Sequence, residues 1–109
     1  MRRAIVWSVL SLAGVASAGA QDAASGEKVY AAQKCSLCHS IAGKGNVKGS
    51  LDGVGAKLSA DDIRAWIVDP AGMTVKTKAA RKPPMPAKYK TLPKDDLDGL
   101  VAYLASLKK

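Results

Sequence analysis

The residues Cys35-Ser36-Leu37-Cys38-His39 form a C-x-x-C-H pentapeptide, which constrains the chain more than any other feature. In this pattern each cysteine thiol can add across one vinyl group of a haem, and the adjacent imidazole can bind the iron from one face. The motif therefore predicts one covalent haem c, with Cys35 and Cys38 as thioether anchors and His39 as the proximal iron ligand. The imidazole nitrogen that is not on iron is expected to donate to a backbone carbonyl.

Other uses of these residues are less well supported. The chain contains only two cysteines and one histidine, and all three lie in the pentapeptide. A structural zinc site normally needs four Cys or His ligands. A thioredoxin-like dithiol expects a βαβ context, and no strand-rich pattern flanks Cys35. A plain disulfide in an oxidising compartment is the remaining alternative. Haem attachment is favoured over all three.

The first twenty residues have the three-part layout of a secretory signal peptide. Two arginines precede an uncharged apolar run, and small residues follow at positions 16–20. Cleavage can follow Ala18 or Ala20, and Ala20 is favoured. An uncleaved anchor is the alternative, but the uncharged stretch is rich in Ala, Ser and Gly and would insert poorly. We predict a signal peptide over 1–20, a mature domain over 21–109, a periplasmic location in a bacterium and no stable membrane span after cleavage.

The mature domain is short and poor in large apolar side chains. It has 89 residues and no phenylalanine, and one of the two tryptophans of the chain leaves with the leader. A domain of this size builds a thin core unaided and usually needs a cofactor or covalent staples. A buried haem would supply much of the missing apolar volume. The candidates for its wall are Leu37, Leu51, Val54, Leu58, Trp66, Ile67, Leu100 and Leu104.

The chain is strongly basic, with a formal net charge of +8. Loss of two arginines with the leader leaves fifteen basic and nine acidic residues, a net charge of +6. The lysines can form a basic ring that guides docking to acidic redox partners, or they can simply keep the surface soluble. Trp66, Tyr89 and Arg81 are candidate partners for the haem propionates. Nucleic-acid binding is not expected of an exported chain without interleaved aromatic and basic residues.

Three helical segments are predicted, over 25–34, 59–69 and 93–107. Ser59 and Asp62 form a capping box for the second, and the third carries one apolar stripe. The members of that stripe are Leu97, Leu100, Val101, Leu104 and Leu107. Alternating strand patterns are absent, which predicts an all-α domain with extended Gly- and Pro-rich loops. The basic segment 74–82 has no predicted structure.

The sixth position of the iron decides what a haem site does. His39 is the only histidine, so Met73 and Met85 are the thioether candidates in the mature chain. Met85 lies among three prolines over 83–86, which restrict the backbone and stiffen the loop. Met73 lies in a more flexible setting after a predicted helix. The residues favour Met85 and leave Met73 as the alternative.

The ordered set of motifs resembles the class I, mitochondrial-cytochrome-c-like, monohaem c-type cytochromes of bacteria. The matching residues span nearly all of the mature domain: Gly26 and Tyr30, the pentapeptide, Leu51–Gly55, Trp66-Ile67 before Pro70, Met85-Pro86, and Leu100 with Tyr103. The resemblance implies a small all-α cytochrome c fold of three or more helices around one haem. It implies that the first and last helices cross at Gly26, and it gives Met85 the distal role.

These inferences together predict a periplasmic single-electron carrier with His/Met ligation, which shuttles electrons between redox partner proteins and is not an enzyme. A monomer is expected. The alternative is a haem c subunit of a multi-protein periplasmic oxidoreductase complex, whose motifs would be the same. A gas sensor or enzyme with an open sixth position is disfavoured, because no titratable pair is placed for acid–base chemistry.

Overall fold

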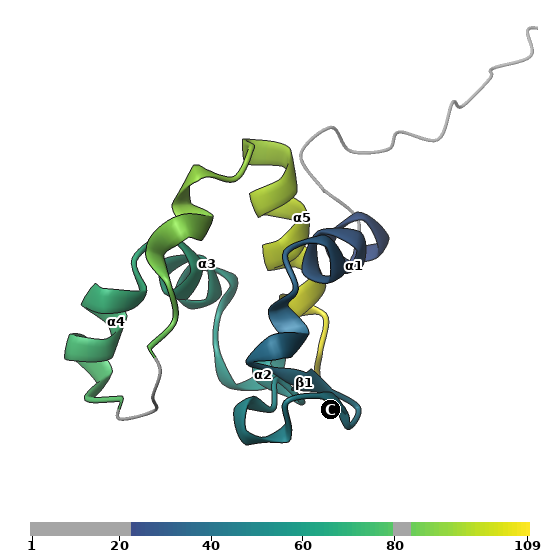
Figure 1. The fold of residues 1–109 in the computed structure, drawn as a ribbon, viewed down its shortest axis with the longest axis horizontal. Helices are drawn as coiled ribbons and strands as arrows, with labels where there is room; N and C mark the ends of the chain where they lie inside the picture. The colour runs from purple at the N-terminus through teal and green to yellow at the C-terminus, as the bar shows by residue number, and fades with distance from the viewer. Residues whose placement is uncertain (1–22, 80–83) are drawn as a thin grey trace, which may run out of the picture.

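A computed structural model describes residues 23–79 and 84–109, which form a mostly helical domain with one very short two-stranded sheet (Figure 1). The predicted signal peptide, Arg81 and Pro83 lie outside the described residues. The elements in chain order are α1 (Ala23–Ala32), η1 (Cys35–Leu37), β1 (Ser40–Ile41), β2 (Lys44–Gly45), η2 (Val47–Gly49), α2 (Val54–Lys57), α3 (Ala60–Val68), α4 (Pro70–Thr77), η3 (Ala87–Thr91) and α5 (Lys94–Ala105).

Helices α1 and α5 cross in direct contact at Gly26, as the family resemblance implied. A Cβ atom built at Gly26 would lie 1.9 Å from the Gly99 carbonyl oxygen and 2.5 Å from the Tyr103 Cβ atom. Only glycine therefore permits this approach. One turn further along α1, the Tyr30 ring packs edge-on against Tyr103, with 5.9 Å between the ring centroids. The pentapeptide begins three residues after α1 ends at Ala32.

Two consecutive caps define helices α3 and α4. The Ser59 hydroxyl accepts a hydrogen bond from the Asp62 amide at 3.1 Å, which confirms Ser59 as the N-cap and gives one of the two bonds of the predicted capping box. Helix α3 ends at Val68, and the Asp69 carboxylate then accepts from the Gly72 amide to begin α4. Pro70 occupies the first turn of α4, where its missing N–H costs nothing.

Helix α4 corrects the predicted setting of Met73. The sequence analysis interpreted Pro70 only as the stop of the preceding helix and placed Met73 in a flexible connection. Met73 instead lies within α4 and is only 9% exposed. The Asp-Pro pair both ends one helix and starts the next, so the two signals overlap at one point in the chain.

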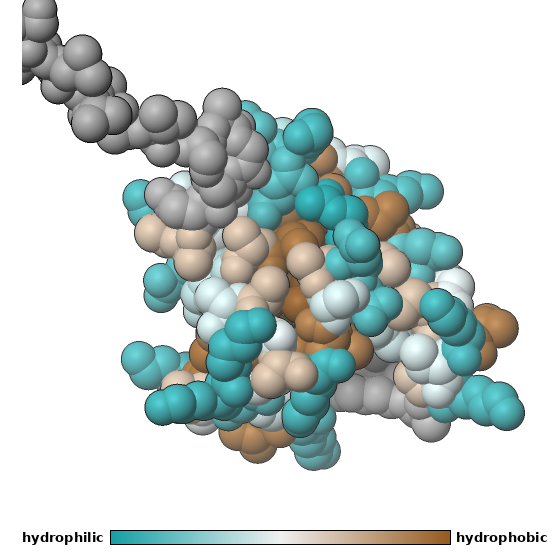
Figure 2. All heavy atoms as spheres, turned by 180° about the vertical axis from the view of Figure 1, so that it is seen from behind, coloured by the Kyte–Doolittle hydropathy of each residue, from teal (hydrophilic) through white to brown (hydrophobic). Residues whose placement is uncertain are grey.

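The core lies where α1, α3 and α5 meet. The apolar stripe of α5 faces inward as predicted, with Leu100, Val101 and Leu104 all under 10% exposed. Tyr30 of α1, Ile63 and Ile67 of α3, and Tyr89 of η3 complete the buried cluster. The view from behind shows brown apolar surface between teal side chains (Figure 2). The chain therefore leaves part of its apolar interior open.

A short antiparallel pair, β1 with β2, was not predicted. Ser40 pairs with Gly45 and Ile41 with Lys44. Strands of two residues are too short to show an alternating pattern in sequence. The Asn46 side chain accepts from the Lys48 amide at 3.1 Å and so begins η2 directly after the pair.

A small charge network on the surface joins α3 to α5 and gives a pH-dependent prediction. Asp98 receives hydrogen bonds from Lys94 at 2.8 Å and from Arg64 at 2.7 Å, and these bonds lower the pKa of the Asp98 carboxyl. The resulting stability is present above the ordinary carboxyl pKa of about 4 and is lost as the pH falls through the lowered value. We expect Asp98→Asn to reduce the urea midpoint slightly at pH 7, and this deficit to disappear as the pH falls through the lowered pKa of Asp98. A deficit that grows on acidification would contradict this assignment.

Candidate functional site

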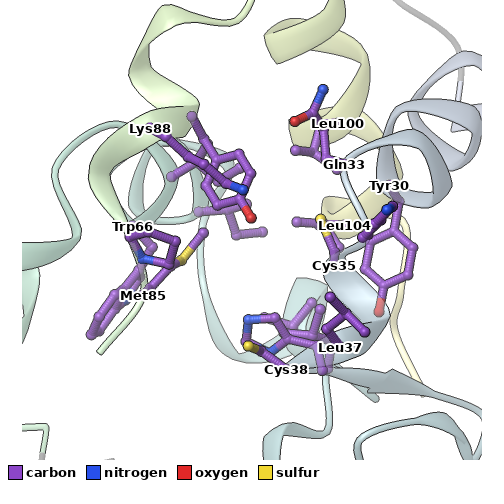
Figure 3. Close-up of a pocket in the computed structure, with 18 of the residues that line it drawn as sticks. Tyr30, Gln33, Cys35, Leu37, Cys38, Trp66, Met85, Lys88, Leu100 and Leu104 are labelled. Atoms are coloured by element: carbon purple, nitrogen blue, oxygen red, sulfur yellow. The ribbon is translucent and has the colours of Figure 1, made fainter. Parts of the chain in front are cut away.

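One cavity of about 700 Å³ brings the predicted site residues together. Cys35, Cys38, His39 and Met85 all line it, whereas Met73 is not among its described lining residues. Its size lies within the ~300–1,000 Å³ of cofactor and ligand pockets. Figure 3 shows Cys35 and Cys38 on one side of the cavity and Met85 on the opposite side, next to Trp66. All eight predicted wall residues line it.

The pentapeptide begins where α1 is forced to stop. Lys34 adopts a left-handed conformation, with φ 56° and ψ 39°, which ends the helical path and starts η1. The amides of Cys38 and His39 then both donate to the Cys35 carbonyl, at 3.1 Å and 2.9 Å. This turn brings both half-buried thiols to the same cavity. The two cysteines form no disulfide in the described structure, and burial raises the pKa of the Cys35 thiol.

The His39 ring is oriented by the segment that follows it. Its Nδ1 lies 2.9 Å from the Gly49 carbonyl oxygen, to which a ring N–H donates. This tautomer makes Nε2 the nitrogen that would bind a metal, and such a bond also raises the basicity of the ligand. The Gly49 amide in turn donates to the Asn46 carbonyl at 3.0 Å. The expected backbone acceptor for the imidazole is therefore present, ten residues along the chain.

Gly45 and Asn46 contact the backbone of the pentapeptide, and the sequence analysis did not identify them as site residues. The Asn46 amide donates to both the Ser36 and the His39 carbonyl, at 3.1 Å and 3.0 Å. Gly45 has a φ of 108°, and a Cβ atom there would lie 2.3 Å from the His39 carbonyl oxygen. A Gly-Asn pair is a turn signal, and it was the one sequence cue for this contact.

Polar groups are few in the cavity. Lys34, Lys88 and Tyr89 line it, and the Lys88 ammonium lies 5.3 Å from the centroid of the Tyr89 ring. Trp66 and Tyr89, both predicted as propionate partners, are therefore at the cavity. Arg81, the third, lies outside the described residues. An apolar cavity with a few cationic and hydroxyl groups suits a flat hydrophobic ligand that bears carboxylates.

A comparison with protein-family models decides the family: the Cytochrome c model matches residues 23–108. The chain belongs to the cytochrome c family. This family carries electrons on covalently attached haem c, and the donor set fits that group: two thiols one turn apart at an apolar cavity, followed by an oriented imidazole. Searches of curated proteins and of solved structures gave no match. Within the described ranges, no helix is both long and apolar enough to cross a membrane.

Tyr30 gives a stability prediction within this cytochrome c domain. Its hydroxyl is buried without a hydrogen-bond partner among the described residues, and desolvation raises its pKa to about 12. Tyr30→Phe keeps the ring contact and removes the desolvated hydroxyl, so we expect it to raise the free energy of unfolding by about 1 kcal/mol. In the wild type, stability falls as the pH rises from about 10, so the advantage of the variant should increase there.

The measurement is urea unfolding of both proteins at pH 7 and at pH values up to about 11. Tyr89→Phe is the comparison variant at pH 7, because Tyr89 is equally buried at 9% exposure and its hydroxyl is not among the unpaired buried atoms of the described residues. A clear loss of stability in Tyr30→Phe would show that this hydroxyl has a partner, such as an ordered water.

Proposed function

We propose that this protein is a periplasmic single-electron carrier with one haem c, attached through Cys35 and Cys38 and ligated by His39 and Met85. The observation that carries the proposal is the shared cavity, which collects these four residues and not Met73. The cytochrome c family membership supports the cofactor and the electron-carrier role. The partners are other redox proteins, and the protein acts as a monomer and not as an enzyme.

His/Met ligation suits a carrier because it changes little on electron transfer. When bound, the haem supplies one iron that gains an electron from a donor protein and passes it to an acceptor. A soft thioether favours the Fe(II) state and raises the potential relative to two imidazoles. The chain contributes fixed ligands: Gly49 orients the His39 ring, and Pro84 and Pro86 restrict the backbone on both sides of Met85.

Export completes the proposal. Cytochrome c domains are typically exported, and the positive, apolar and small-residue order of residues 1–20 supports secretion and cleavage after Ala20. The family match begins at residue 23, with two residues between it and the end of this segment. We therefore propose that the mature protein comprises residues 21–109 and resides in the periplasm.

The test is expression of the full chain in a bacterium that attaches haem c, followed by intact mass and a pyridine haemochrome spectrum. We expect a chain that begins at Gln21, carries one haem and gives the spectrum of two thioether bonds. Cys35→Ala and Cys38→Ala should each leave one unreacted vinyl group and shift that spectrum. A mature chain without haem, or with a Cys35–Cys38 disulfide, would refute the proposal.

The ligation is tested separately by carbon monoxide. The reduced protein at neutral pH should not bind it, because Met85 fills the sixth position. Ready binding would instead indicate an open site and favour a gas-binding or enzymatic role.

A further inference from the structure

The His39 imidazole is oriented by the backbone carbonyl of Gly49, which lies 2.9 Å from Nδ1. The strength of this hydrogen bond depends on where the loop between the two residues places that carbonyl. A ring N–H that donates more strongly makes the imidazole a better electron donor to iron, which favours the oxidised state and lowers the midpoint potential. The contacts that fix the loop over residues 40–50 therefore influence the potential.

This loop turns at a residue that is unfavourable for the turn. Ala42 and Gly43 connect β1 to β2 as a two-residue turn, with φ values of 53° and 80°. Two positive φ values at the centre of a hairpin are typical of a type I′ turn, for which Asn, Asp or Gly is preferred at the first position. Alanine adopts the left-handed region only at a cost. The turn therefore needs support from outside the hairpin.

The Asp52 carboxylate provides this support. It accepts a hydrogen bond from the Ala42 amide at 2.7 Å. Hydrogen bonds from a backbone amide to a carboxylate are shorter and stronger than those between neutral groups. The start of β1 is tied to the same segment, because the Leu51 amide donates to the Ser40 carbonyl at 2.8 Å. Both bonds fasten the hairpin to the residues that directly follow the acceptor of the imidazole.

The segment that carries Asp52 is itself anchored to the end of α5. The Gly55 amide donates to the Leu107 carbonyl at 2.8 Å, and the Lys108 ammonium donates to the Gly55 carbonyl, also at 2.8 Å. Among the described residues the hairpin packs mainly against η1 and η2. Asp52 therefore joins the hairpin to a part of the chain that is fixed to a long helix.

We propose that Asp52 is a positioning residue for the proximal His39 imidazole. It holds the turn at Ala42, and Asn46 connects the hairpin to the site. The Asn46 amide donates to the His39 carbonyl at 3.0 Å, and the Asn46 carbonyl accepts from the Gly49 amide at 3.0 Å. Asp52 thereby keeps the Gly49 carbonyl against the ring and keeps the midpoint potential low. This inference rests on the proposed function, because it assigns His39 to the iron.

The test measures two properties of the haem-loaded protein: the solvent-exchange rate of the His39 Nδ1 proton, followed by NMR of the reduced state, and the midpoint potential. Asp52→Ala should make this proton exchange roughly fivefold faster, because the ring hydrogen bond opens more often. Asp52→Asn retains an acceptor oxygen and should exchange like the wild type. Both variants lose the same charge, so we expect a higher potential for Asp52→Ala than for Asp52→Asn, and this difference measures positioning alone.

A second substitution at the turn should rescue the first. Ala42→Gly removes the side chain that disfavours a positive φ, so Asp52→Ala/Ala42→Gly should exchange like the wild type. Asp69→Ala is the matched control, because the exposed Asp69 carboxylate also accepts from a backbone amide, that of Gly72 at 3.1 Å. This control should lower the stability of the protein and leave the exchange rate of the His39 proton unchanged.

An unchanged exchange rate in Asp52→Ala, or an equal acceleration in Asp69→Ala, would overturn the positioning role. Failure of Ala42→Gly to restore the rate would show that Asp52 does not act through the turn, and would overturn it as well. In each of these cases the protein still carries its haem with His/Met ligation, so the proposed function stands. Wild-type protein without haem, or without His39 on the iron, would overturn both.

Discussion

Met85→Ala is expected to abolish the sulfur-to-iron charge-transfer absorption of the oxidised protein and to lower the midpoint potential by roughly 0.2 V. Axial ligands set haem potentials over a range of about 0.8 V, and loss of the thioether removes the ligand that favours Fe(II). Met85 lines the cavity opposite the cysteines and is only partly buried, so little packing is lost with it. The reduced variant should also bind carbon monoxide, because its sixth position is open. Absorption spectra and a redox titration measure all three effects.

Met73→Ala is the matched control, because it removes the other candidate thioether. Met73 is 9% exposed within α4 and does not line the cavity among the described residues. We expect it to cost about 2–4 kcal/mol of stability through lost packing, with the absorption band and the potential unchanged. The opposite pattern, in which the band survives Met85→Ala and disappears in Met73→Ala, would refute the distal assignment.

The contrast between these two methionines shows what sequence could and could not provide. The rigid backbone around Met85 could be predicted from the sequence, because three prolines lie within three residues of it and proline restricts its own backbone. The burial of Met73 could not be predicted, because it depends on helix α4, which starts at Asp69-Pro70 where helix α3 ends. The Asp69-Pro70 pair can end one helix or start another, and only the packing of the segments before and after it decides between these outcomes.

Contacts between residues that are distant in the sequence could not be predicted either. The pentapeptide identified His39, but its hydrogen-bond acceptor is a backbone carbonyl at Gly49, and every residue has a carbonyl. The choice of Gly49 depends on Asn46 and on the close approach of Gly45, both set by the fold. The α5 stripe, in contrast, was predictable because a twelve-residue helix repeats its pattern several times.

Gly26→Ala should lower the free energy of unfolding of the haem-loaded protein by about 2–4 kcal/mol. Helix propensity alone predicts the opposite sign, because alanine is favoured over glycine in a helix by about 1 kcal/mol. The new Cβ atom would lie 1.9 Å from the Gly99 carbonyl oxygen, which is backbone and cannot rotate away. Helices α1 and α5 must therefore separate, and the edge-on contact of Tyr30 with Tyr103 must open with them. Denaturant unfolding of both proteins at neutral pH measures the difference.

The exposed residue Lys28, two positions further along α1, provides the internal control. The free energies of unfolding of Lys28→Ala and Lys28→Gly give the effect of alanine against glycine in the same helix at a position away from the helix crossing. At position 28 alanine should be favoured by about 1 kcal/mol. A sign reversal between positions 26 and 28 can only come from the contact with α5. If alanine stabilises the protein at both positions, α1 and α5 do not approach each other this closely at Gly26.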